Sequence, residues 1–171
     1  NNTMTIQEYI EKTLPMTIRE NKEDNDPLLG LPYPYIIPSA SGMFQEMYYW
    51  DTYFANKGLL LRGDTTQVRN NIDNLRALLD RFGFVLNGSH KGFQYNSQPP
   101  FLAMMIRELY DVTGDKAWLK DAYASVKKEH EFWMNKRMTV CGLNRYDCEQ
   151  LHETWIKNAA DCLADRMGFR P

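Results

Sequence analysis

Leu61-Arg-Gly-Asp64 is a predicted corner between two helices, and a corner of the same kind returns at Val112-Thr-Gly-Asp115. Glycine can end a helix in the left-handed conformation, and the aspartate that follows it can cap the next helix. Amphipathic segments flank both corners. We therefore predict repeated helical hairpins, each of which buries an apolar stripe against its neighbours. The pattern favours an all-α chain, and arrays of this kind include both solenoids and closed α/α toroids.

The helix after the first corner has the clearest pattern, with one apolar stripe and a polar opposite face. Its stripe consists of Val68, Ile72, Leu75, Leu79 and Phe82, and Gly83 ends it. Further helices are expected over residues 5–14, 47–61, 99–113, 116–137 and 150–167. The expected stripe of the 116–137 helix consists of Leu119, Ala122, Tyr123, Val126, His130 and Trp133.

Prolines and glycines interrupt residues 21–47, where few apolar positions are periodic. We expect a long extended stretch there, and long loops in compact domains tend to be functional or linking. No segment alternates well enough to predict a sheet. We therefore divide the chain into an N-terminal helix with an extended proline-rich segment, residues 1–46, and the helical hairpins, residues 47–171.

Composition and charge argue against several classes of function. The net charge of −2 gives no electrostatic reason to expect nucleic acid or an anionic membrane as a partner. No apolar run approaches the roughly 18 residues that would span a bilayer. The odd number of cysteines, Cys141, Cys148 and Cys162, predicts free thiols, and their spacing with His152 matches no standard zinc pattern. We expect no metal or other cofactor. The expected compartment is the cytoplasm, with the periplasm and secretion as alternatives.

Phe44-Gln-Glu-Met-Tyr-Tyr-Trp-Asp-Thr-Tyr53 combines aromatic rings with two carboxylates, Glu46 and Asp51. Rings can cover the apolar C–H face of a sugar, and carboxylates or amides can hold its hydroxyl groups. The competing interpretation is that these rings only form core, as aromatic residues at helical spacing usually do. However, the consecutive apolar and aromatic residues 47–50 cannot all face one core, so we expect some rings to line a cavity.

Two later stretches have ordinary explanations when each is taken alone. Asn87-Gly88 is a turn signal, and Gln98-Pro-Pro100 indicates the start of a helix. Together with the aromatic run, however, they resemble the trehalase family of glycoside hydrolases. The first signature of that family, Pro-Gly-Gly-Arg-Phe-x-Glu-x-Tyr-x-Trp-Asp-x-Tyr, is matched by Ser39-Ala-Ser-Gly-Met-Phe-Gln-Glu-Met-Tyr-Tyr-Trp-Asp-Thr-Tyr53.

Four further stretches extend the resemblance over roughly residues 30–148. The family's Pro-Asn-Gly-Asn-Arg and Ser-Arg-Ser-Gln-Pro-Pro are matched by Leu86-Asn-Gly-Ser-His90 and Tyr95-Asn-Ser-Gln-Pro-Pro100. Two more landmarks follow in the right order, Glu131-Phe-Trp-Met134 and Gly142-Leu-Asn-Arg-Tyr146. The resemblance implies helical hairpins of an (α/α)6 toroid, of which this chain holds an incomplete part. It also implies that the sugar is bound or flanked by Phe44, Glu46, Trp50, Asp51, Asn87 and Gln98.

The chain departs from the family pattern in two ways. Met43 and Asn96 stand where the family has arginines, and neither can replace the fixed fork of donors of a guanidinium. The family's catalytic acid is an aspartate in a Ser-Gly-Trp-Asp motif and its base is a later glutamate, and the chain contains no Gly-Trp-Asp. We therefore assign no catalytic residue. A replacement pair of Glu46 and Asp51 is less favourable, because the match gives both a binding role.

The resemblance thus implies the front part of a trehalase-like glycoside hydrolase whose parent hydrolyses an α-glucoside, above all α,α-trehalose, with inversion. We expect the chain alone to be inactive while holding part of the sugar-binding wall. Two alternatives stay open. One is a non-catalytic sugar-binding domain, and the other is a helical interaction scaffold that self-associates through uncovered toroid faces.

Overall fold

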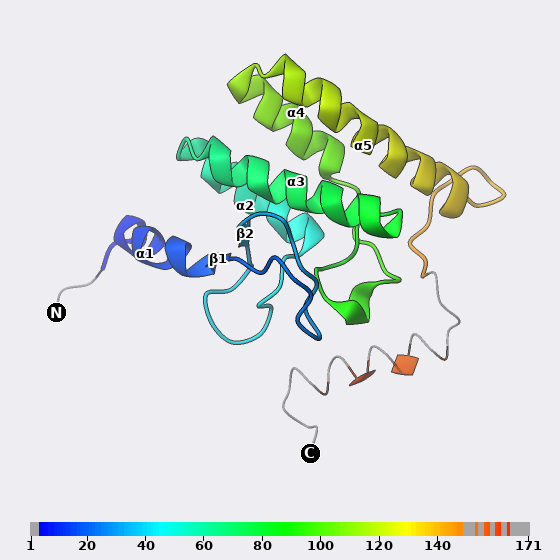
Figure 1. Cartoon of the computed structure of the whole chain (residues 1–171), viewed down its shortest axis with the longest axis horizontal. Helices are drawn as coiled ribbons and strands as arrows, with labels where there is room; N and C mark the ends of the chain where they lie inside the picture. Colours follow the sequence, from blue (N-terminus) through cyan, green and yellow to red (C-terminus); the bar gives the residue numbers. More distant parts are fainter. Residues whose placement is uncertain (1–3, 149–152, 154–155, 158–159, 162–163, 165–171) are drawn as a thin grey trace.

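The computed structural model describes residues 4–148, 153, 156–157, 160–161 and 164. Within these residues the chain is mostly helical, with five α-helices and one pair of short strands (Figure 1). The helices are α1 Ile6–Thr13, α2 Tyr49–Leu61, α3 Thr65–Phe82, α4 Leu102–Thr113 and α5 Lys116–Lys136. Two short 3-10 helices lie at Leu14–Thr17 and Lys91–Phe93. The helix expected over residues 150–167 falls mostly outside the described residues.

Both predicted corners are present, and they join α2 to α3 and α4 to α5. Gly63 and Gly114 have positive φ angles of 77° and 64°. The carboxylates of Asp64 and Asp115 each accept a hydrogen bond of 3.0 Å from the backbone N–H three residues further on. Asp115 also pairs with Arg69 of α3 at 2.7 Å, so the second corner is fixed to the first hairpin.

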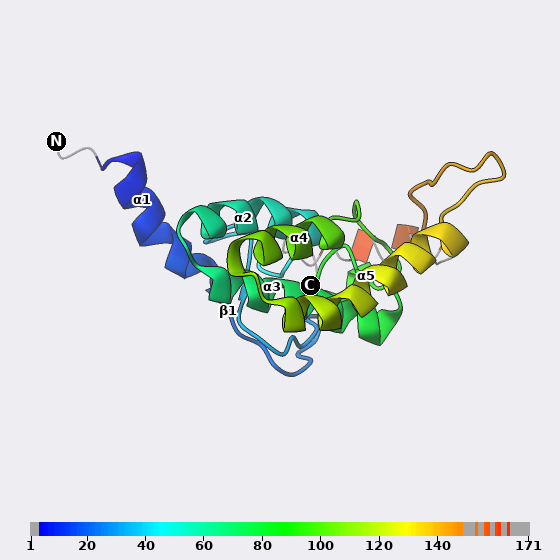
Figure 2. The same ribbon diagram turned by 90° about the horizontal axis from the view of Figure 1, so that it is seen from above.

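The long helix α3 lies at the centre of the helical body. It contacts α2, α4 and α5, and its stripe residues Val68, Ile72, Leu75 and Leu79 are buried in one core cluster. Helix α1 buries none of its residues. Figure 2 shows α1 and the loop after α5 projecting from opposite ends of this body.

The two strands, β1 Ile18–Arg19 and β2 Tyr35–Ile36, pair antiparallel across the proline-rich segment. The sequence predicted no sheet, and strands of two residues are too short to show an alternating pattern. Leu29, Leu31 and Ile37 of this segment are buried in the same core cluster as the helices. The segment therefore packs as part of the core.

A row of amides on α3 holds the proline-rich segment by its backbone. Asn71 accepts a hydrogen bond from the N–H of Ile36 at 3.1 Å, and Asn74 accepts one from the N–H of Tyr33 at 3.0 Å. Gln67 donates to the carbonyl oxygen of Pro34 at 3.0 Å. All three amide side chains are buried. They replace the ladder partners that so short a strand pair leaves unsatisfied.

The buried face of α5 differs from the predicted stripe. Trp118, Ala122, Ser125, Glu129 and Trp133 are buried, whereas Tyr123 and His130 are exposed. The prediction was wrong at those two positions because two polar residues occupy the buried face. Both have partners on other helices, since Arg76 of α3 donates to Ser125 at 3.0 Å and the hydroxyl of Tyr49 of α2 donates to Glu129.

Candidate functional site

A cavity of about 330 Å³ lies where the start of α2 meets two later loops. Its lining residues are Pro38, Phe44, Tyr48, Trp50, Asp51, Asn87, Phe93 and Gln98. Five of the six predicted site residues therefore surround one cavity. The sixth, Glu46, is buried and does not line it. Glu46 lies close to Tyr35, where its charge adds to burial in raising the pKa of the phenol.

The first loop is held against the start of α2 by backbone hydrogen bonds. The N–H of Tyr49 donates to the carbonyl of Asn87 at 3.2 Å, and the N–H of Ser89 donates to the carbonyl of Met47 at 2.9 Å. Between them Gly88 fits closely, because a Cβ there would lie 3.1 Å from the Met47 oxygen. This pairing places Asn87 beside the first turn of α2.

Gln98 closes the cavity from the second loop. Its side-chain oxygen accepts a hydrogen bond of 2.9 Å from the N–H of Trp50. That N–H belongs to the first turn of α2, where backbone donors have no partner within the helix. The amide nitrogen of Gln98 makes no hydrogen bond to any described residue. The two loops are joined by the N–H of Asn87 and the carbonyl of Asn96, 2.7 Å apart.

Aromatic rings form one wall of the cavity. Tyr48 lies between Phe44 and Phe93, with ring centroids 5.7 Å and 5.8 Å away. Phe44 and Trp50 are each 44% exposed. Phe44 also has a φ of 64°, a backbone conformation that costs energy for a residue with a side chain. The backbone strain thus lies at the cavity wall.

Sequence reasoning missed Pro38, Tyr48 and Phe93 as lining residues. Tyr48 lies inside the aromatic run, so the sequence shows that its side chain is aromatic but not that this side chain points into the cavity. Phe93 lies in a loop of mixed polar and aromatic residues, where no periodicity shows which side chains turn inward. No local pattern marks Pro38.

Asp51 is the one carboxylate among the residues that line the cavity. Burial raises its pKa above the ordinary value of 3.8. It lies in the first turn of α2, where the positive end of the helix dipole favours a carboxylate. Inverting glycoside hydrolysis needs two carboxylates with room for a water between them. The lining of the cavity therefore does not contain an acid–base pair of carboxylates.

No group of three or more metal-ligating side chains occurs among the residues that the structure describes. Cys141 is an exposed free thiol, and Cys148 is partly exposed. Cys162 and His152 lie outside the described part. No described helix is both long and apolar enough to cross a membrane.

Comparison with known proteins identifies the family. The family model "Trehalase" matches residues 3–163. The chain belongs to the trehalase family. It is 38% identical over 133 residues to a periplasmic trehalase of Escherichia coli O139:H28 and 37% identical over 133 residues to a trehalase of Arabidopsis thaliana. It is 35% identical over 125 residues to a probable trehalase of Oryza sativa subsp. japonica.

This trehalase-family chain is much shorter than those relatives. The matches cover 77%, 77% and 73% of the chain but only 23%, 21% and 22% of the three relatives, in the same order. The solved structure of neutral trehalase Nth1 from Saccharomyces cerevisiae superposes with a TM-score of 0.64 at 26% identity. That match covers 80% of this chain and 27% of the yeast chain. The fold is thus similar to part of a larger trehalase.

Proposed function

We propose that the chain forms part of the sugar-binding wall of a trehalase-like glycoside hydrolase. The longer enzyme to which it belongs would hydrolyse an α-glucoside with inversion, and the substrate we propose is α,α-trehalose. The observation that carries the proposal is the single cavity lined by Phe44, Trp50, Asp51, Asn87 and Gln98. The hairpins α2–α3 and α4–α5 are, in this proposal, the first hairpins of an (α/α)6 toroid.

The chemistry of the lining suits one sugar ring. The half-exposed ring of Trp50 offers an apolar face, while Asp51 accepts and the amides of Asn87 and Gln98 donate and accept hydrogen bonds. A volume of about 330 Å³ lies at the low end of small-molecule sites. Because the cavity holds one carboxylate, the chain binds sugar without hydrolysing it.

Trehalose binding is tested by the shift in melting temperature of the purified chain. A sugar that binds only the folded state at ten times its Kd stabilises that state by about 1.4 kcal/mol. We expect trehalose to raise the Tm and the β-linked disaccharide cellobiose to leave it unchanged. Trp50→Ala should abolish the shift, whereas Tyr123→Ala, which removes an exposed ring on α5, should keep it. Equal shifts with both sugars, or none with trehalose, would contradict the proposal.

Hydrolysis is tested separately by glucose release from trehalose. We expect none from the chain alone. Turnover that disappears in Asp51→Ala would overturn the proposed inactivity and make Asp51 part of an acid–base pair.

The second candidate function is that of a self-associating helical scaffold, and the exposed apolar residues of α1 favour it. Its residues Ile6 and Tyr9 are 82% and 60% exposed, and Ile10 one turn later lies on the same face. An exposed apolar stripe favours association. Light scattering that shows a monomer at high protein concentration would contradict this.

We also propose a cytoplasmic location, which the free thiol of Cys141 supports and cell fractionation would test.

A further inference from the structure

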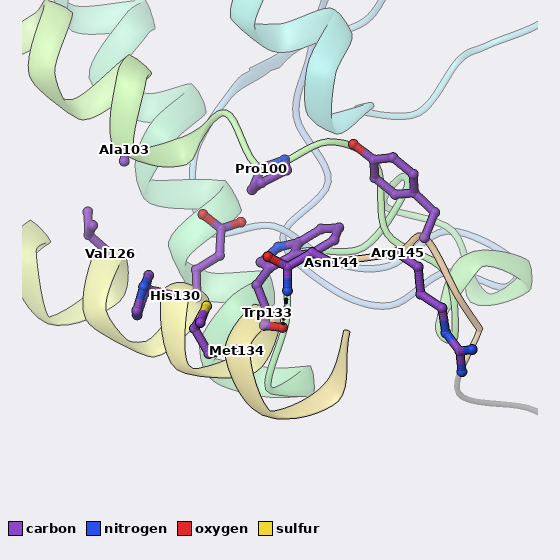
Figure 3. A pocket seen from close by; sticks show the side chains of 10 residues that line it. Pro100, Ala103, Val126, His130, Trp133, Met134, Asn144 and Arg145 are labelled. Carbon is purple, nitrogen blue, oxygen red and sulfur yellow. Dashed lines mark hydrogen bonds between the residues drawn. The ribbon is translucent and has the colours of Figure 1, made fainter. Parts of the chain in front are cut away.

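A second cavity, of about 410 Å³, lies beside α5 and shares no lining residue with the first. Figure 3 shows side chains from the start of α4, from α5 and from the loop after α5 around the hollow. Most of the lining is apolar or aromatic, with Val126, Trp133, Met134 and Tyr146 as the larger groups. The rings of Trp133 and Tyr146 meet edge to face, with centroids 5.5 Å apart. Apolar and aromatic lining is typical of a small-molecule site.

Glu129 lines this cavity although it is only 5% exposed. One of its oxygens accepts a hydrogen bond from the hydroxyl of Tyr49. That hydroxyl also accepts the N–H of Leu102 at 2.8 Å, so Tyr49 is fully engaged. The second carboxylate oxygen of Glu129 has no hydrogen-bond partner within the described part of the chain.

No described cation compensates the charge of Glu129, since burial raises its pKa and no nearby positive charge lowers it. Arg76 of α3, which packs against α5, is paired with Asp73 and Asp121. Arg145 from the loop lines the same cavity but pairs with Asp147 at 2.7 Å, and His130 on α5 is exposed and forms no ion pair with Glu129. Helix α4 presents Ala103 there, which carries no charge, and α2 presents only the neutral hydroxyl of Tyr49. Buried carboxylates in proteins are normally paired, because an isolated buried charge is costly.

We propose that this cavity binds an organic cation, a protonated amine on a small apolar body. The ammonium group donates to the second oxygen of Glu129, and the aromatic lining of Trp133 and Tyr146 adds cation–π attraction. The apolar body packs against Val126 and Met134. The ligand supplies the counter-charge that the buried carboxylate lacks. Charge and shape therefore select the same class of ligand.

Binding of the amine cation is coupled to the release of one proton from Glu129. When Glu129 is protonated, the amine cation displaces that proton, which passes to the solvent, and the ammonium–carboxylate pair remains. Affinity therefore rises with pH while Glu129 is protonated in the free protein and levels off once it is ionised. Burial raises the pKa of Glu129 to about 7, which places this change near neutral pH.

Calorimetric titration with 2-phenylethylammonium and its neutral counterpart 2-phenylethanol tests the proposal. At about pH 8 we expect the wild type to bind the cation at least about tenfold more tightly than the alcohol. Glu129→Gln should lose this preference while still binding the alcohol, which shows that its cavity is intact. The matched control is Glu131→Gln, an exposed carboxylate two residues further on that does not line the cavity, and it should keep the preference.

The pH dependence gives a second readout. For the wild type, affinity for the ammonium probe should fall about thirtyfold between about pH 8 and pH 5.5, because each pH unit below the pKa costs about tenfold. Titrations in two buffers of different ionisation enthalpy should show proton release at the lower pH. Equal affinity for the two probes in the wild type, or a preference that survives in Glu129→Gln, would overturn the proposal.

Discussion

Replacing Glu129 by Gln should make the protein more stable at alkaline pH and leave it nearly unchanged in acid. Burial raises the pKa of Glu129 from its ordinary 4.5 to about 7, partly offset by the hydrogen bond from Tyr49. The folded state therefore keeps a proton that the unfolded state gives up. The stability that this carboxyl contributes is fully present below about pH 4.5 and is lost as the pH rises to about 7. Glutamine keeps the shape and can still accept from Tyr49 without ionising.

The size of the effect follows from the two pKa values. One pKa unit corresponds to about 1.36 kcal/mol, so the gap from 4.5 to about 7 corresponds to about 3 kcal/mol. Between about pH 4.5 and pH 8, the difference in unfolding free energy between Glu129→Gln and the wild type should change by that amount in favour of the variant. This is a large share of the about 5–15 kcal/mol that stabilises a typical domain.

Urea unfolding at a series of pH values measures this difference. The two proteins differ only at position 129, so the contributions of all other groups cancel in the comparison. Glu131→Gln serves as the control. Its carboxylate is exposed and lies 3.8 Å from Lys127, so it should stay within about 0.5 kcal/mol of the wild type at every pH. A difference between Glu129→Gln and the wild type that does not change with pH would refute the reasoning.

Three further substitutions should change stability by amounts that urea unfolding can rank. Gly88→Ala should cost about 1–3 kcal/mol and weaken trehalose binding, because its Cβ would press on the backbone at the start of α2; an unchanged midpoint would contradict this. Asn71→Ala should cost about 1–3 kcal/mol by leaving the buried N–H of Ile36 without a partner. Asp115→Ala should cost about 1 kcal/mol through the lost helix cap, whereas Asp111→Ala, which breaks an exposed ion pair, should cost under about 0.5 kcal/mol.

Local chemistry made part of the fold predictable. Helix ends depend on a few adjacent residues, so the corner at Gly63-Asp64 and the stop at Gly83 were both confirmed. The α3 stripe was predicted because apolar side chains with helical spacing lie on one face of the helix, and that face packs against the core. The face of α5 was not, since Ser125 is buried through a partner on another helix that no local pattern reveals.

Five of the eight residues that line the candidate cavity were predicted from the sequence, but the way they come together was not. Trp50 and Asn87 lie far apart in the sequence and meet through backbone hydrogen bonds beside them. Residue types signal binding chemistry, whereas the side chains that close the wall, such as Phe93, are set by loop geometry. The division of the chain at residue 46 stays a prediction, as does the binding role of the six site residues.

The amide row of α3 also affects the timing of folding on the ribosome. The backbone N–H groups of Tyr33 and Ile36 find their partners on Asn74 and Asn71, which are 41 and 35 positions later in the chain. At about 5–20 residues per second, translation delivers those partners roughly 2–8 s afterwards. During that interval the proline-rich segment is hydrated and open to proteases. Nascent chains halted with this segment outside the ribosome but Asn71 and Asn74 still inside it should therefore be cleaved in the segment, and chains halted after α3 has left the ribosome should be protected there.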